Sequence, residues 1–143
     1  MTGFYNTLST RKPNWMPDLE AVIRSWSEKK FAWGITDCCV FCGECIKAMT
    51  GNNPFTPFAG YNDRQGALKT LKAKGRGTLP TTLVAVLGVP LHVSKAAAGD
   101  IVLNCDKKNP AIGLCVGVDS LFISPDDGLI YVETSTCGKV FKI

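Results

Sequence analysis

The sequence predicts an α+β fold in a single domain that covers residues 1–143. Two observations support this prediction. Before residue 89, the chain contains segments with helical apolar spacing or with recognisable helix start and stop residues. After residue 89, it contains short runs rich in β-branched and aromatic residues, separated by turn-forming residues. Helices followed by strands within 143 residues indicate helices packed on a small sheet.

The first helix is predicted to begin near Pro17, after an N-terminal arm of residues 1–16. Its apolar positions follow the spacing i, i+3, i+4, i+7 and would form one stripe: Leu19, Val22, Ile23 and Trp26. A proline in the first turn and Asp18 near the positive end of the helix both favour this start.

Three further helices are predicted, each followed by a glycine that can end it. Their expected ranges are 38–49, about 65–74 and about 81–87, and the terminating residues are Gly51, Gly75 and Gly88. The third carries basic residues at helical spacing, which we interpret as a solvent-exposed face: Lys69, Lys72 and Lys74, with Arg76 just beyond.

The second half is predicted to form an antiparallel meander of five short strands. The runs are IVLNC, IGLCVGV, SLFI, LIYVET and KVFKI, at residues 101–105, 112–118, 120–123, 129–134 and 139–143. Asp-Lys-Lys-Asn-Pro, Pro-Asp-Asp-Gly and Cys-Gly lie between runs and are typical of turns.

Composition indicates a compact soluble domain, because 45% of the residues are hydrophobic and 20% are charged. The formal net charge is +4, and the basic residues are scattered, so no nucleic-acid partner is expected. No segment approaches the ~18 continuous apolar residues of a membrane-spanning helix. The first residues lack the features of a signal peptide, so synthesis in a cytoplasm is expected.

Four of the seven cysteines lie within GITDCCVFCGEC, residues 34–45, and three interpretations of this stretch compete. The first is a metal site. Cys39, Cys42 and Cys45 have the spacing C-x2-C-x2-C, and Cys38 replaces Cys39 in a C-x3-C-x2-C alternative. Both spacings occur in iron–sulfur proteins, whereas a zinc site would need a further ligand from elsewhere.

The second interpretation is packing. Cys42 and Cys45 share a helical stripe with Phe41, Ile46 and Met49, and buried cysteine behaves as a small hydrophobic residue. The third interpretation concerns only the start of the helix. Asp37 is suited to cap it, and a thiol at position 38 would have a lowered pKa because of the helix dipole, as in nucleophilic cysteines.

The surroundings of this cysteine resemble the nucleophile segment of NlpC-type, papain-like cysteine peptidases, which are bacterial and phage cell-wall endopeptidases. The matching stretch is FAWGITDCCVF, residues 31–41, with Asp37-Cys38 opening a helix. Downstream, AGDIVL (98–103) resembles the family's Gly-Asp-hydrophobic strand, and IGLCVG (112–117) its next strand. The resemblance implies an NlpC-like, papain-type fold in which Cys38 occupies the nucleophile position.

The chain also resembles a small family of phage proteins encoded among tail genes. The shared features occur in order over most of residues 17–143: the first helix, Trp33-Gly34, Asp37-Cys38, Met49-Thr50-Gly51-Asn52, Tyr61, Gly66-Ala67-Leu68, Leu71, Gly75, Gly99-Asp100, 112–117, Gly128-Leu129 and Phe141-Lys142-Ile143. This resemblance implies a virion protein of the phage tail, with other tail proteins as partners.

One departure affects the expected chemistry. In active NlpC-type enzymes a histidine stands two residues before the glycine of the second strand motif, and here that position is Ala111. The chain's one histidine, His92, precedes the Gly-Asp motif, so it could act as the base for Cys38 only in a rearranged geometry. Asp100, Asp119 and Glu133 are alternative partners that the sequence does not distinguish.

We therefore expect a phage tail-associated structural or assembly protein, near the distal end or hub of the tail, that keeps a peptidase-like fold without the standard dyad. The alternative is an active cysteine peptidase or amidase that cuts peptidoglycan during phage entry, with Cys38 as nucleophile and His92 or Asp37 assisting. An iron–sulfur or zinc module built on Cys38 or Cys39 with Cys42 and Cys45 is a further alternative. No cofactor is expected for the first two.

Overall fold

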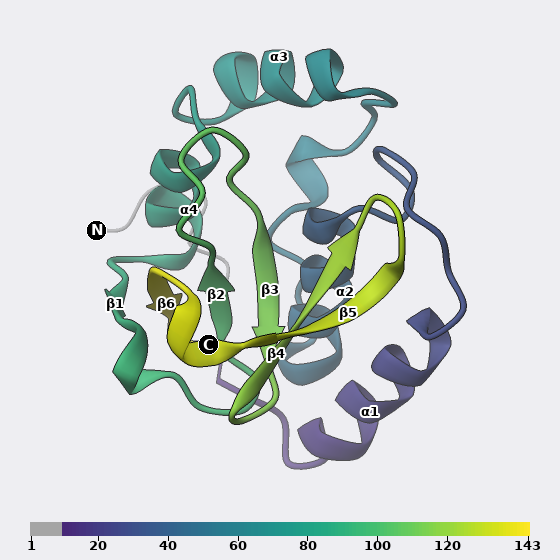
Figure 1. Ribbon diagram of the computed structural model, residues 1–143, viewed down its shortest axis with the longest axis vertical. Helices are drawn as coiled ribbons and strands as arrows, with labels where there is room; N and C mark the ends of the chain where they lie inside the picture. Colours follow the sequence, from purple (N-terminus) through teal and green to yellow (C-terminus); the bar gives the residue numbers. More distant parts are fainter. Residues whose placement is uncertain (1–9) are drawn as a thin grey trace.

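The computed structural model of the protein describes residues 10–143, and its helices precede its strands along the chain, as predicted. The helices are α1 (Trp15–Trp26), α2 (Cys38–Thr50), α3 (Arg64–Lys74) and α4 (Leu79–Leu87). The strands are β1 (Leu91–His92), β2 (Ile101–Leu103), β3 (Ile112–Cys115), β4 (Asp119–Ser124), β5 (Gly128–Glu133) and β6 (Lys139–Phe141). The α+β class is therefore confirmed (Figure 1).

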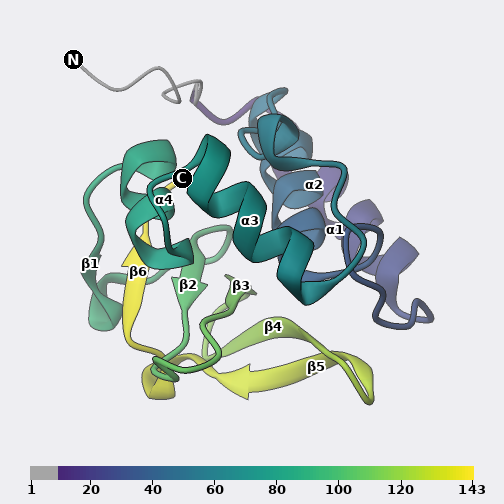
Figure 2. The same ribbon diagram turned by 90° about the horizontal axis from the view of Figure 1, so that it is seen from above.

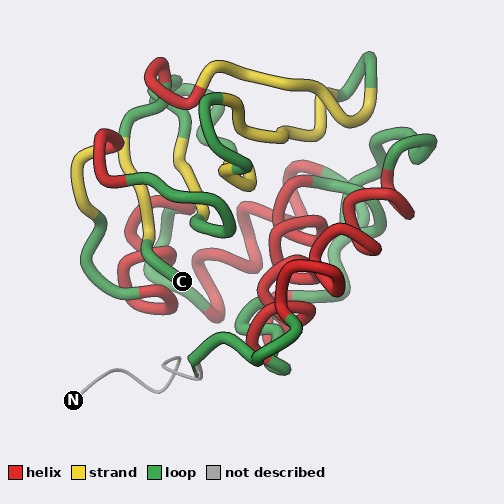
Figure 3. The backbone as a smooth tube through the Cα atoms, turned by 90° about the horizontal axis from the view of Figure 1, so that it is seen from below, coloured by secondary structure: helices red, strands yellow, loops and turns green. Residues whose placement is uncertain are grey.

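The helices form one layer and the sheet forms another, as the view from above shows (Figure 2). The view from below shows the same separation, with the strands in yellow and the helices in red (Figure 3). α2 packs against both α1 and β3, so it lies between the outer helix and the sheet. Within residues 10–143, no helix has the length and apolar character needed to cross a bilayer.

All four predicted helices are present, with small differences at their starts. α1 begins at Trp15, so it overlaps the last residues of the predicted arm 1–16, and residues 1–9 of that arm lie outside the described part of the chain. α3 and α4 begin before the predicted positions because of N-caps that the prediction overlooked. Asp63 accepts a hydrogen bond from the N–H of Gly66, and Thr78 forms a capping box with Thr81.

The prediction of a simple meander is wrong for the last strand. The strand order in the sheet is β1-β6-β2-β3-β4-β5, and every pairing is antiparallel. Strands β2 to β5 follow one another as predicted, but β6 returns across the sheet and pairs with β2, placing Phe141 opposite Ile101. The two-residue strand β1, which was not predicted, pairs with the other side of β6.

Alternation along the strands divides the apolar residues between two faces of the sheet. Residues on one face pack against the helices: Ile101, Leu103, Ile112, Leu114, Leu121, Ile123 and Phe141. Residues on the other face form a second cluster: Val102, Cys115, Phe122, Cys137 and Val140. The short 3-10 turn Val93–Lys95 packs beside β6 and contributes Val93 to this second cluster.

Trp26, at the end of α1, joins that helix to α2. Its side chain is fully buried and lies edge-on to Phe41 with ring centroids 5.1 Å apart. Its indole N–H donates a hydrogen bond to Glu44 (3.1 Å), so the one polar atom of the ring is satisfied. The Lys29 ammonium lies over the ring, 4.7 Å from its centroid.

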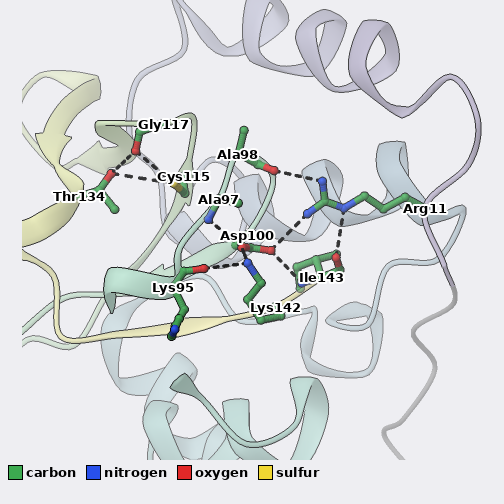
Figure 4. Close-up of polar contacts among 10 residues, drawn as sticks. All are labelled: Arg11, Lys95, Ala97, Ala98, Asp100, Cys115, Gly117, Thr134, Lys142 and Ile143. Atoms are coloured by element: carbon green, nitrogen blue, oxygen red, sulfur yellow. Dashed lines mark hydrogen bonds and ion pairs between the residues drawn. The ribbon is translucent and has the colours of Figure 1, made fainter. Parts of the chain in front are cut away.

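The carboxylate of Asp100 connects both ends of the described chain to the sheet (Figure 4). It is 0% exposed and lies just before β2. It forms ion pairs with Arg11 (3.2 Å) and with Lys142, and it accepts hydrogen bonds from the backbone N–H groups of Ala97 (2.9 Å) and Ile143 (3.1 Å). A fully buried carboxylate is stable only when it is paired and hydrogen-bonded in this way.

Arg11 extends the same network. Its guanidinium also donates to the carbonyl oxygens of Ala98 (3.0 Å) and Ile143 (3.1 Å), and its charged end lies 4.3 Å from the Trp15 ring centroid. One arginine thus links the segment before α1, the turn before β2 and the residue after β6.

We expect Asp100→Ala to reduce the free energy of unfolding by about 2–4 kcal/mol, because two backbone N–H groups lose a fully buried acceptor and the two ion pairs are lost with it. Arg11 and Lys142 are partly exposed and can turn toward water, so they add less. Chemical denaturation of the full chain measures the loss. Asp126→Ala, at an exposed turn, is the matched control and should change stability by less than about 0.5 kcal/mol. Equal stabilities of the two variants would contradict a central role for Asp100.

Candidate functional site

The candidate site is built around Cys38, the first residue of α2, as predicted. Asp37 is the N-cap of this helix, and its carboxylate accepts a hydrogen bond from the N–H of Val40 (2.9 Å). The other carboxylate oxygen accepts from the N–H of Gly34 (2.8 Å) and from the hydroxyl of Tyr61. Asp37 is buried, and all of these contacts fix the point at which α2 begins.

The loop before the helix packs closely against the segment that carries Tyr61. Gly34 has φ +76°, and a Cβ atom at this position would lie 1.9 Å from the Tyr61 carbonyl oxygen. Only glycine fits both constraints at this turn. Trp33 is at the surface and packs edge-on against Phe31, with ring centroids 5.1 Å apart.

The surroundings of Cys38 lower the pKa of its thiol. The largest cause is a hydrogen bond from the Cys39 thiol, and the backbone of Ile112 at the start of β3 contributes another. Both stabilise the thiolate, while burial and the Asp37 carboxylate act in the opposite direction. The pKa of Cys39 is raised well above its ordinary value, first because its thiol donates this hydrogen bond. Cys38 is therefore the member of the pair that carries negative charge more readily.

Tyr61 belongs to this site, although no role was predicted for it from the sequence. It stands in the motif order shared with the phage family, but nothing in that pattern placed its hydroxyl on Asp37. Burial is the main cause that raises the pKa of Tyr61, and the neighbouring Cys39 and Asp37 raise it further. The phenol is therefore a neutral hydrogen-bond donor that holds the Asp37 carboxylate.

The structure does not bring His92 to Cys38. His92 lies on β1 at one edge of the sheet, whereas Cys38 reaches the start of β3, and β6 and β2 lie between these two strands (Figure 1). Three interstrand steps correspond to roughly 14 Å. The His92 ring instead bonds to the hydroxyl and the N–H of Ser94, at 2.8 and 3.1 Å.

Ala111, the position that would hold histidine in an active NlpC-type enzyme, precedes β3 directly. Its side chain packs with the cluster on the sheet face away from the helices, whereas the following residue, Ile112, faces α2. The position therefore lacks an imidazole and also directs its side chain to the face opposite Cys38. The resemblance implied only the first of these two differences.

The carboxylates considered as partners are also engaged or distant. Asp100 is held by Arg11 and Lys142, and Asp119 lies opposite Glu133 where β4 begins and β5 ends. Asp37 acts on the Cys38 thiol electrostatically, but it raises the thiol's pKa and is committed to capping. It orients the helix that carries Cys38 and does not hold its proton.

Cys42 and Cys45 are fully buried in the core between the helices and the sheet, which confirms the packing interpretation. Burial raises the pKa of both thiols. Within residues 10–143, no group of three or more His, Cys, Asp or Glu side chains is arranged to hold a metal ion. The metal-site alternative for Cys38, Cys39, Cys42 and Cys45 therefore has no support from the described geometry.

Two buried cysteines, Cys115 and Cys137, lie away from this site. Cys115 is buried on the other face, where its thiol contacts the carbonyl of Gly117 (3.4 Å) and the hydroxyl of Thr134 (3.9 Å) (Figure 4). Thr134 also bonds to Ser120 (2.8 Å), so this small network closes the β3–β4 turn onto the end of β5. Cys137 is buried beside it, and burial raises its pKa to about 11. These thiols are structural.

Comparison with protein families places nearly the whole chain in one of them. A family model described as a domain of unknown function, DUF6950, matches residues 10–143. The chain belongs to the DUF6950 family. No curated protein matches it. The family match covers the site, the helices and the entire sheet, and its description states no activity.

We expect Asp37→Ala to destabilise the protein by about 2–4 kcal/mol, because a helix cap and two further part-buried hydrogen bonds to a buried carboxylate are lost together. Asp63→Ala is the matched control, since Asp63 caps α3 through a single exposed contact with Gly66. Its cost should be about 1 kcal/mol or less. Thermal or denaturant unfolding compares the two variants, and equal losses would show that the Gly34 and Tyr61 contacts contribute nothing.

We also expect Cys38 to be alkylated by iodoacetamide with a pH midpoint below the ~8.5 of an ordinary thiol, because only the thiolate reacts and a lowered pKa keeps it populated at lower pH. Cys42 and Cys45 should react only after denaturation, because they are buried and their pKa values are raised. Mass spectrometry of peptides from protein labelled at several pH values gives each rate. A Cys38 midpoint at or above 8.5 would contradict the inferred hydrogen bonds.

Proposed function

We propose that the protein is a phage tail-associated structural or assembly protein that keeps a peptidase-like arrangement around Cys38 but does not catalyse hydrolysis. The observation that carries this proposal is a thiol without a base. Cys38 stands at the start of a buried helix packed on an antiparallel sheet, yet the chain's one histidine lies on a different part of that sheet. General-base catalysis needs the base at about 2.6–3.2 Å, or at one water's remove.

The proposal includes an NlpC-like, papain-type relationship for the fold. A cysteine that opens a helix, with that helix packed against a strand that begins just after the expected histidine position, supports this relationship. The phage tail location rests on the resemblance over residues 17–143. In this reading the site is a relic: Asp37 and Gly34 are retained because they fix the start of α2, whatever the thiol does.

The surface is consistent with contacts to other proteins. Several large apolar side chains are exposed on separate loops and strands: Ile35, Val89, Val118 and Tyr131. β5 is the outer strand at one end of the sheet, so its free edge offers unpaired backbone groups to a neighbour. In the proposed role these surfaces contact other tail proteins at the distal end or hub.

A second candidate is an active cysteine peptidase or amidase acting on peptidoglycan. The lowered pKa of the Cys38 thiol favours it, because a thiolate already formed needs less help from a base. This candidate requires a proton donor for the leaving amine, and neither His92 nor Asp37 is placed for that role.

The test is Cys38→Ala in the phage genome that encodes the chain. We expect particles of normal composition, containing the protein by mass spectrometry, with infectivity within about twofold of the parent. Normal particles that fail to infect, together with release of peptides from cross-linked peptidoglycan by the parent protein alone, would instead establish the enzyme. Absence of the protein from purified particles would contradict a tail location. Cys42→Ala serves as a control for simple destabilisation, because Cys42 fills the core behind Cys38.

A further inference from the structure

A hollow with apolar walls lies apart from Cys38, between α4 and the ends of β2 and β6. Its volume is about 450 Å³, within the range of natural ligand pockets. Leu103 and Phe141, both core residues, form its floor. Val84 of α4 and the prolines Pro90 and Pro110 form its walls. The hollow therefore borders the hydrophobic core, where Leu103 and Phe141 are buried.

The helix beside this hollow has an apolar outer surface. α4 has the sequence LPTTLVAVL and contains no charged residue, although a surface helix normally turns a polar face to water. Val84 is 41% exposed, and the segment after the helix adds Val89 at 82% and Leu91 at 45%. An apolar surface that continues past the rim of a pocket is typical of a protein-binding site.

The polar groups at the hollow indicate the charge of its occupant. Two lysines, Lys107 and Lys139, line it together with Asp106. The Oδ1 of Asp106 accepts the N–H groups of Lys108 (3.0 Å) and Asn109 (3.1 Å), which holds this carboxylate in the loop, and its one charge offsets only one of the two lysines. Among residues 10–143, neither lysine forms an ion pair with a carboxylate. The rim can therefore bind an anionic group beside the apolar floor.

The neighbouring strand indicates an extended occupant. β1 is the outermost strand at this end of the sheet, so the edge facing away from β6 is unpaired. Leu91 on this two-residue strand directly follows Pro90, which lines the hollow, so β1 begins beside the hollow. An extended peptide can pair with such an edge while one of its side chains enters the pocket.

We propose that this hollow binds a peptide segment of a partner protein in which a bulky apolar side chain adjoins an acidic residue. The apolar side chain fills the space over Leu103 and Phe141, and the carboxylate lies between Lys107 and Lys139. This inference goes beyond the proposed function, because the hollow does not include Cys38 and its occupation is independent of where the protein works.

The experiment uses the full chain to select from a random peptide library displayed on yeast. The enriched sequences should combine Leu, Ile, Phe or Trp with a neighbouring Asp or Glu. A synthetic copy of the most enriched peptide should bind at least about tenfold more weakly to Val84→Arg, which blocks the mouth, and to the double variant Lys107→Glu/Lys139→Glu, which reverses the rim charge. Val89→Asp should also weaken binding of this peptide, and because Val89 is highly exposed this change leaves the core untouched.

The matched controls are Val118→Arg, which makes the same substitution at an exposed position on another loop, and Lys72→Glu, on the exposed face of α3. Both should bind the peptide like the parent chain. The proposal is overturned if no sequence is enriched, if the enriched peptides lack acidic residues, or if Val118→Arg weakens binding as much as Val84→Arg. Binding of the apolar anion 1-anilinonaphthalene-8-sulfonate at this hollow without any peptide binding would also overturn it, in favour of a small-molecule site.

Discussion

The buried carboxylate of Asp100 is the interaction on which the arrangement of this protein most depends. It forms ion pairs with Arg11 and Lys142, one near each end of the described chain, and accepts hydrogen bonds from two backbone N–H groups. The strand that follows it, β2, is the one against which β6 pairs when it returns across the sheet. Without this acceptor, the segment before α1 and the residues after β6 would lose their shared anchor. Asp100 therefore connects the segment before α1, the start of β2 and the residues after β6.

α2 combines a structural and a chemical role within one helix. Its buried side carries Phe41, Cys42 and Cys45, which pack between α1 and the sheet. Its first residue is Cys38, whose thiol is stabilised as thiolate by Cys39 and by the backbone of β3. The same cap and the same packing therefore fix both the buried side of α2 and the position of Cys38.

The region of Cys38 and the hollow beside α4 differ in whether their polar groups are paired. The region of Cys38 is closely packed, and its polar groups satisfy one another: Asp37 with Tyr61 and Gly34, and Cys39 with Cys38. The hollow beside α4 is the reverse, since its lining is mostly apolar and its two lysines pair with no described carboxylate. Satisfied groups stabilise the fold, whereas uncovered apolar surface and unpaired charge favour a partner. The unmet interactions of the structure therefore lie away from Cys38.

The sequence by itself determined the α+β class, the C-terminal ends of α2, α3 and α4, the cap at Asp37 and the burial of Cys42 and Cys45. These features depend on residues within one or two helical turns, so spacing and capping chemistry suffice to predict them. Only the tertiary structure decided that β6 crosses back to β2, that Ala111 faces away from Cys38, and that His92 lies across the sheet from it. It also joined Arg11 to Asp100, 89 residues along the chain. Such pairings depend on strand order and on which face a residue occupies, and no local pattern encodes either.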